Sequence, residues 1–200
     1  MRLTLWTLPV LFTATVCTVA CGGGTTEAPA SSAASASTAS PAASPTPGLP
    51  ANAPQPTPVI EAQTKALAAL GPHTQAQYPP IPFEGYPPPR PAEVVKAAYQ
   101  FAAEHPEVAS YVPCFCGCQN GGHKGNHDCF VRSRAANGDV LEWEPHGLEC
   151  AVCIDVATLS RQLLASGASV QEIRASVEKE FGPSAQTMTP TPKPPTAHTH

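Results

Sequence analysis

The pattern of apolar and polar residues predicts a helical hairpin toward the end of the chain. Apolar residues at helical spacing begin near Cys150 and continue to Gly167, a residue type that commonly ends a helix. Ser169 and Glu172 then form the Ser-x-x-Glu pattern of a capping box, which starts a second helical stretch. Because so short a connection places consecutive helices antiparallel, we expect a helical hairpin over about 150–182.

Two further elements are predicted before this hairpin. Apolar residues at helical spacing favour a helix over about 91–105, where His105-Pro106 breaks the pattern. The dipeptide Asn137-Gly138 lies between two short apolar runs and favours a tight turn, and therefore a short β-hairpin. The expected fold class is mainly α: a small helical domain with a helical hairpin, one further helix and a short β-hairpin, stapled by a Cys/His cluster.

The first residues of the chain have the pattern of a secretory signal peptide. Met1-Arg2 precedes an apolar run that ends in a small residue before Cys21, as in a bacterial lipobox. We therefore expect a lipoprotein signal peptide over 1–20 and acylation, for example with palmitate, at Cys21. This predicts an extracytoplasmic protein, anchored by lipid to a membrane of the bacterial cell envelope. The alternative is an uncleaved anchor, but a run of about eighteen moderately apolar residues is at the short limit for a bilayer.

Composition divides the rest of the chain into disordered segments and one domain. Residues 21–58 are almost entirely Ala, Ser, Thr, Pro and Gly, so they cannot bury enough apolar area to fold and form a lipidated, disordered tether. We expect a short helix and Pro-rich linker over 59–88, a Cys/His-rich domain over 89–182 and a disordered Pro-rich tail over 183–200. The formal net charge of -4 at pH 7 leaves no basic stripe, which argues against nucleic acid as a partner.

Thiol and imidazole side chains are concentrated in one stretch of this domain. Six of the eight cysteines and three of the seven histidines lie between Cys114 and Cys153. Cys114, Cys116 and Cys118 alternate, so their sulfurs share one face of an extended stretch, and Gly117 lets the backbone curl and bring them toward one centre. Alternating cysteines make strained disulfides with each other. Such a density of soft donors indicates a metal centre or a thiol-redox centre.

Cys150 and Cys153 form a Cys-x-x-Cys pair at the start of the predicted hairpin. The dipole at the N-terminal end of a helix favours the thiolate form of cysteine. Because a thiolate both binds metals and attacks disulfides, this pair fits either chemistry.

The same residues carry a resemblance to a known family. Pro113-Cys-Phe-Cys-Gly-Cys118, followed by His123, Cys129, His146 and the Cys-x-x-Cys pair, resembles the bacterial PCYCGC-motif lipoprotein family over about 91–182. Phe115 stands where the family name has tyrosine. The resemblance implies an envelope location and the motif itself but no mechanism, because the biochemical function of that family is not settled.

A second similarity covers only residues 150–182. A Cys-x-x-Cys that opens a helix, a leucine-rich face and a Gly-Ala-Ser corner are similar to the thiol-reductase subunit of cytochrome c maturation. That similarity has no counterpart to the segment 113–118, so it implies a shared helical-hairpin geometry.

Three functions fit these observations. The first, which we favour, is a metal-binding module with a role in metal handling and a metal-handling or redox protein as partner. Its predicted ligands are Cys114, Cys116, Cys118, His123, Cys129, His146, Cys150 and Cys153. Because one tetrahedral zinc takes four ligands, this set suits zinc with spare thiols or a small Cu(I)-thiolate cluster.

The two alternatives use the same sulfurs differently. One is an enzyme, a thiol-disulfide oxidoreductase or its redox partner, that uses Cys150 and Cys153. The other is a non-catalytic interaction module stapled by three disulfides. His127 lies within the cysteine-rich stretch but outside the family pattern, so it is not among the predicted ligands.

Overall fold

The structure is a computed structural model that describes residues 49–50, 53–83, 85 and 87–195. The predicted signal peptide, the predicted lipidation site Cys21 and most of the predicted tether lie outside the described residues. None of the helices in the described part is long and apolar enough to cross a membrane.

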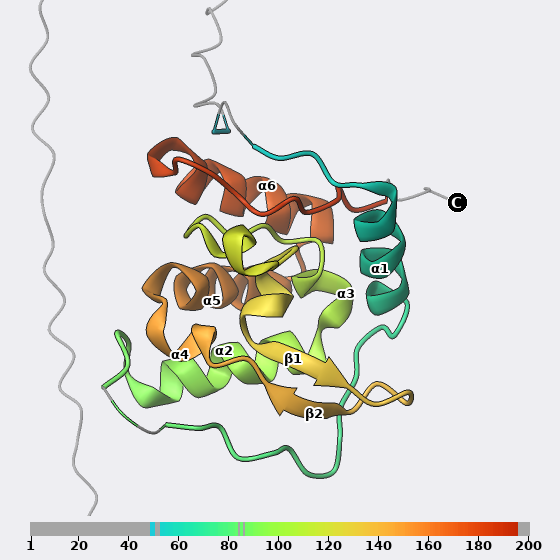
Figure 1. Ribbon diagram of the computed structural model, residues 1–200, viewed down its shortest axis with the longest axis vertical. Coiled ribbons are helices and arrows are strands. Elements are labelled where there is room, and N and C mark those ends of the chain that lie inside the picture. The colour runs from blue at the N-terminus through green and yellow to red at the C-terminus, as the bar shows by residue number, and fades with distance from the viewer. Residues whose placement is uncertain (1–48, 51–52, 84, 86, 196–200) are drawn as a thin grey trace, which may run out of the picture. The chain divides into compact units, whose positions relative to one another are not determined.

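Within the described part, four main helices make up most of the fold. They are α1 (Pro58–Ala68), α2 (Ala92–Glu104), α5 (Ala151–Ala165) and α6 (Val170–Phe181). The helix α5 packs against α6 on one side and against α2 on the other (Figure 1). The predicted hairpin of helices and the predicted helix before it are both confirmed.

The capping box at the start of α6 is present as the sequence predicts. Ser169 Oγ accepts from the N–H of Glu172 at 3.3 Å, and the Glu172 carboxylate accepts from the N–H of Ser169 at 2.8 Å. These two bonds satisfy donors that the first turn of a helix otherwise leaves unpaired.

The short β-hairpin is also confirmed. Strands β1 (Val131–Arg134) and β2 (Val140–Trp143) pair antiparallel, with Val131 opposite Trp143. The connecting turn contains Gly138 with φ of 95°, a left-handed conformation that glycine adopts without a Cβ penalty. The fold is therefore mainly helical with a two-stranded antiparallel hairpin.

Five short helical turns connect these elements and carry much of the cysteine-rich stretch. They are α3 (Pro106–Ala109), η1 (Cys118–Gly121), η2 (Asn126–Cys129), α4 (His146–Glu149) and η3 (Gly182–Ser184).

Aromatic side chains join the helical part of the core to the hairpin. Tyr99 of α2 is fully buried, and its ring meets Phe130 edge-on at 5.1 Å between centroids and Trp143 at 5.3 Å. The Tyr99 hydroxyl donates to the carbonyl of Glu144 at 2.6 Å. Phe130 precedes β1 and Glu144 follows β2, so both lie at the open end of the hairpin. This packing therefore holds the cysteine-rich loops against α2.

Residues 185–195, which follow η3, differ from the sequence-based expectation of a disordered tail over 183–200, whereas residues 196–200 of that tail lie outside the described residues. Thr189 and Thr191 are buried, and Thr189 exchanges two hydrogen bonds with the backbone of Cys114. Arg174 of α6 is also buried and donates to the carbonyls of Thr191, at 3.1 Å, and Pro192. The segment is ordered because it forms hydrogen bonds with the buried guanidinium of Arg174 and with the backbone of Cys114. Local composition does not reveal these partners.

Candidate metal centre

The motif segment is held in place through its backbone. Cys114 donates its N–H to Thr189 Oγ1 at 2.8 Å, and its carbonyl accepts from the N–H of Thr189 at 2.9 Å. Gly117 has φ of 87°, in the left-handed region, and the chain turns there to start η1 at Cys118. The Sγ atoms of Cys114 and Cys116 lie 3.7 Å apart. The predicted curl at Gly117 is therefore present and brings the alternating cysteines together.

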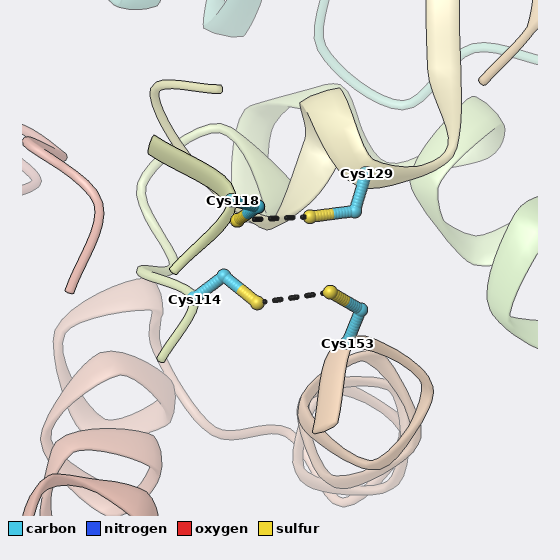
Figure 2. A group of neighbouring side chains, drawn as sticks. All are labelled: Cys114, Cys118, Cys129 and Cys153. Carbon is cyan, nitrogen blue, oxygen red and sulfur yellow. Dashed lines mark hydrogen bonds between the residues drawn. The ribbon is translucent and has the colours of Figure 1, made fainter. Parts of the chain in front are cut away.

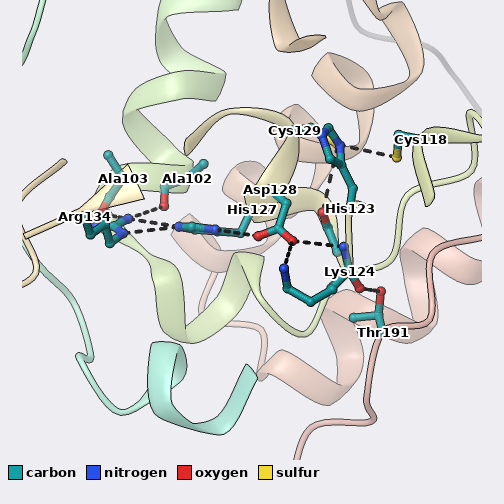
Figure 3. Close-up of polar contacts among 11 residues, drawn as sticks. Ala102, Ala103, Cys118, His123, Lys124, His127, Asp128, Cys129, Arg134 and Thr191 are labelled. Atoms are coloured by element: carbon teal, nitrogen blue, oxygen red, sulfur yellow. Dashed lines mark hydrogen bonds and ion pairs between the residues drawn. The ribbon is translucent and has the colours of Figure 1, made fainter. Parts of the chain in front are cut away.

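Cys129 is placed by a short loop that polar side chains stabilise. Asp128 accepts from the N–H of Lys124 at 2.9 Å and pairs with the Lys124 ammonium at 3.1 Å. His127 is buried, with Nδ1 3.2 Å from Asp128 Oδ1 and Nε2 accepting from Arg134 Nε at 3.3 Å (Figure 3). Burial lowers the pKa of His127. His127 therefore serves the loop as a neutral ring, in keeping with its place outside the family pattern.

The same loop is tied to α5 by Asn126. This fully buried side chain donates from Nδ2 to the carbonyl of Cys153 at 3.1 Å, and the Asn126 N–H donates to the carbonyl of Val112 at 2.8 Å. At the start of α5, Cys150 Sγ accepts from the N–H of Cys153 at 3.4 Å and acts as the N-cap. The Cys-x-x-Cys pair therefore opens a helix, as predicted.

His146 reaches the cysteines because α4 approaches the loop very closely. A Cβ added at Gly147 would lie 2.5 Å from Phe130 Cδ1 and 2.7 Å from the carbonyl oxygen of Cys129. Only glycine allows this approach, which brings His146 Nε2 to 3.5 Å from Cys116 Sγ.

These elements bring all eight predicted ligands into one cluster. Their donor atoms form three overlapping groups of four, and within each group the atoms lie within 4.8 Å of one another. The inner group is Cys114, Cys118, Cys129 and Cys153; the outer group is Cys116, His146, Cys150 and Cys153; the third group is Cys118, His123, Cys129 and His146. Figure 2 shows the four sulfurs of the inner group close together, with Cys114 paired to Cys153 and Cys118 paired to Cys129.

The spacing of the inner sulfurs is close to that of a tetrahedral metal site. Zn–S bonds of about 2.3 Å place the sulfurs of a tetrahedral site about 3.8 Å apart. The distance from Cys118 Sγ to Cys129 Sγ is 3.7 Å, and that from Cys114 Sγ to Cys153 Sγ is 3.1 Å. All six cysteines of the described domain are free. A slight outward movement of these four side chains would give a four-thiolate site with tetrahedral spacing.

A comparison with protein families adds to this geometry. A family model described as a protein of unknown function with PCYCGC motif matches residues 89–194, more than half of the 200-residue chain. The chain belongs to the PCYCGC family. No curated protein matches the chain, and no solved structure does. The PCYCGC match extends to residue 194 and so includes Thr189, which hydrogen-bonds to the backbone of Cys114.

In this PCYCGC-family chain, phenylalanine takes the place of the tyrosine in the motif name. Phe115 is 8% exposed and its ring stacks on Phe181 of α6, with 6.2 Å between centroids and 19° between planes. The middle residue of the motif therefore packs on α6 while the flanking Cys114 and Cys116 turn toward the cluster.

Contacts among the sulfurs shift the thiol pKa values in opposite directions. The contact with Cys116 lowers the pKa of Cys114 to about 5, and the contact with Cys114 lowers the pKa of Cys118 to about 3. The contact with Cys114 raises the pKa values of Cys153 and Cys129. These contacts favour the thiolate form of Cys114 and Cys118 and the protonated form of Cys129 and Cys153. The packing supplies thiolates, the form that binds a metal.

One side of the cluster opens to solvent. An open cavity of about 500 Å³ is lined by four of the predicted ligands, Cys116, Cys118, His123 and His146, and by Arg132 and Glu144. Hydrogen bonds to Cys116 and Cys150 raise the pKa of His146 to about 10. The cavity gives an ion or a ligand direct access to the outer donors.

The sequence patterns did not indicate a role for several residues that support the site. Asn126, Gly147 and Thr189 position ligands through hydrogen bonds or close contacts with residues distant along the chain. For Gly147, the adjacent His146 offered a signal, because a glycine beside a ligand often marks close backbone approach. No local pattern pointed to Asn126 or Thr189.

Proposed function

We propose that this domain is a metal-binding module that holds zinc or Cu(I) through its Cys/His cluster. The observation that carries the proposal is the convergence of four buried cysteines, Cys114, Cys118, Cys129 and Cys153, from separate segments onto one centre. Packing several thiolates together in a nonpolar interior is costly unless a cation compensates their charge. A soft metal provides that cation and satisfies the sulfurs at once.

The arrangement favours metal binding over the two alternatives. A thiol-disulfide oxidoreductase needs a cysteine pair that is free to exchange with its substrate: Cys150 is partly exposed, but its partner Cys153 is fully buried and contacts the motif cysteines. A disulfide-stapled module needs sulfurs in separate pairs. Here Cys153 contacts Cys114 at 3.1 Å and Cys116 at 3.5 Å, so the sulfurs form a shared cluster.

The proposal is tested by metal and thiol content together. Protein produced with its own secretion signal and purified without chelator is analysed for metals, and thiols are counted in denaturant before and after chelation. We expect bound zinc or copper, and six domain thiols that become reactive only after the chelator is added. Metal-free protein with no reactive thiols would instead support the disulfide alternative.

We also propose that the domain is extracytoplasmic and held to the bacterial cell envelope by lipid at Cys21. The support is the signal-peptide pattern and the small residue before this cysteine. Metal ligation would protect the thiols in an oxidising compartment.

The lipid anchor is tested by substitution of its cysteine. Cys21→Ser should move the protein from the membrane fraction to the soluble fraction, because no acyl chain can then be attached. Fractionation followed by immunoblotting measures this, and Cys17→Ser, four residues earlier, is the matched control. Full membrane association of the Cys21→Ser protein would refute the anchor.

A further inference from the structure

The cluster contains more donors than a single metal ion can use. One tetrahedral ion takes four ligands, whereas eight donor atoms lie together here. The inner and outer groups share only Cys153, and a thiolate sulfur has lone pairs enough to bridge two ions. Two four-coordinate ions can therefore be held by seven residues with Cys153 between them.

The inner and outer positions differ in their exposure to solvent. Cys114, Cys129 and Cys153 of the inner group are fully buried, and Cys118 is 7% exposed. In the outer group, Cys116, His146 and Cys150 are partly exposed, and two of the three line the open cavity. Of the inner group only Cys118 lines this cavity, and the other three cysteines are fully buried. An incoming ligand can therefore reach two donors of the outer position without opening the fold, but only one donor of the inner position.

The third group cannot be filled together with the outer one. A neutral imidazole has a single nitrogen lone pair to offer, so His146 serves one ion at a time. The His146 ring lies edge-on to His123, with 5.3 Å between centroids, but its Nε2 lies 3.5 Å from Cys116 Sγ in the outer group. The contact with Cys116, together with the access from the cavity, assigns His146 to the outer group.

We infer that the domain holds two soft metal ions in different roles: an inner structural ion at Cys114, Cys118, Cys129 and Cys153, and an outer ion that is exchanged with incoming thiolates. The outer ligands are Cys116, His146, Cys150 and the bridging Cys153. This inference rests on the proposed function.

The exchange needs no redox partner. Thiols that enter through the cavity bind the ion as thiolates and replace the outer donors one at a time, and the ion keeps its oxidation state throughout. The protons that the incoming thiols release are taken up by Cys116 and Cys150 and by the imidazole of His146 as these leave the metal. The inner ion meanwhile keeps the fold intact, so the outer position can be emptied and refilled.

The experiment measures ion count and release rate for zinc and, under anaerobic conditions, for Cu(I). The loaded wild-type domain should carry two ions per chain and release them to EDTA or bathocuproine disulfonate in two phases, one at least tenfold faster than the other. Cys150→Ser should lose the fast phase and keep one ion. Serine remains a good N-cap, so this change removes the thiolate without removing the cap of α5.

His123 and His146, the two histidines that line the cavity, provide a matched pair of variants. His146→Ala should also abolish the fast phase, whereas His123→Ala should leave two ions and both phases unchanged. Loss of the fast phase in both variants would place the outer ion in the third group, which contains both histidines, and overturn the assignment.

Failure of this inference is distinguishable from failure of the proposed function. A single ion per wild-type chain, or loss of both ions from folded Cys150→Ser, would overturn the two-site inference while metal binding stands. No bound ion with either metal would overturn the proposed function itself. Circular dichroism of each variant shows whether an ion was lost through unfolding.

Discussion

Gly147 shows how a single residue without a side chain builds the cluster. It lets α4 lie against the carbonyl of Cys129 and the ring of Phe130, and so carries His146 to the sulfurs. Gly147→Ala would place a methyl group 2.5 Å from Phe130 Cδ1. We expect the free energy of unfolding to fall by about 1–3 kcal/mol, because the packed aromatic ring cannot move away freely. Chemical denaturation measures the loss, and metal content should fall with it.

Gly121 is the matched control for this substitution. A Cβ at Gly121 meets no atom within 4 Å, and its φ is not in the left-handed region. Gly121→Ala should therefore change stability by no more than about 0.5 kcal/mol. Equal effects of the two substitutions would contradict the role given to Gly147.

Gly117 contributes through its backbone conformation instead. Its φ of 87° costs any residue with a Cβ about 1–2 kcal/mol, although space is free around it. Gly117→Ala should lower stability by this amount and also weaken metal affinity, because it strains the turn between Cys116 and Cys118. Gly167 has a similar φ of 88°, so Gly167→Ala would introduce the same strain at a position far along the chain from the ligands.

Competition with a chelator of known affinity separates the two glycines. Gly167→Ala should lower stability to a similar extent and leave metal affinity unchanged. Weaker metal binding in both variants would mean that stability alone governs affinity.

At the scale of elements, local signals explain what the sequence predicted well. The helices α5 and α6 follow from apolar periodicity, from Gly167 and from a capping box in which both bonds form. The β-hairpin follows from Asn137-Gly138. These signals are contained within a few residues, so no knowledge of the tertiary fold is needed to interpret them.

The C-terminal segment could not be predicted in this way. Its Pro-rich composition is typical of a disordered tail, whereas its order depends on Arg174 and on the backbone of Cys114, which is 75 positions away from Thr189. The sequence likewise yields the eight predicted ligands but not their groups. Which donors share an ion depends on how η1, η2 and α4 pack together.

Thr189 tests the contribution of this segment to the site. Thr189→Val keeps the shape of the side chain but removes the oxygen that accepts from the buried N–H of Cys114 at 2.8 Å. An unpaired buried donor costs about 1–3 kcal/mol, so we expect a loss of stability of that size. Amide hydrogen exchange at Cys114 should become faster. Thr189→Ser keeps the acceptor and should preserve the slow exchange; equally fast exchange in the serine variant would contradict the role of the hydroxyl.

At the scale of the whole molecule, a metal ion in the cluster would act as a cross-link. It would join the motif segment, the loop that ends in η2, the turn α4 and the start of α5, which otherwise meet through a modest core. An ion that binds only the folded chain stabilises it by an amount that depends on its concentration relative to the dissociation constant, about 4 kcal/mol at a thousandfold excess. The stability of this domain should therefore depend on its metal.

Removal of the metal tests this dependence and separates the three functions considered. Chelator added under reducing conditions should lower the thermal unfolding midpoint of the wild-type domain, because the sulfurs lose the cation that holds them together. The Cys129→Ser variant lacks an inner ligand, so it should start from a lower midpoint and respond little to the same chelator. A disulfide-stapled domain would instead respond to the reductant alone, and a redox centre would keep its midpoint under both treatments. Full stability of the wild-type domain after reduction and complete chelation would contradict a structural metal.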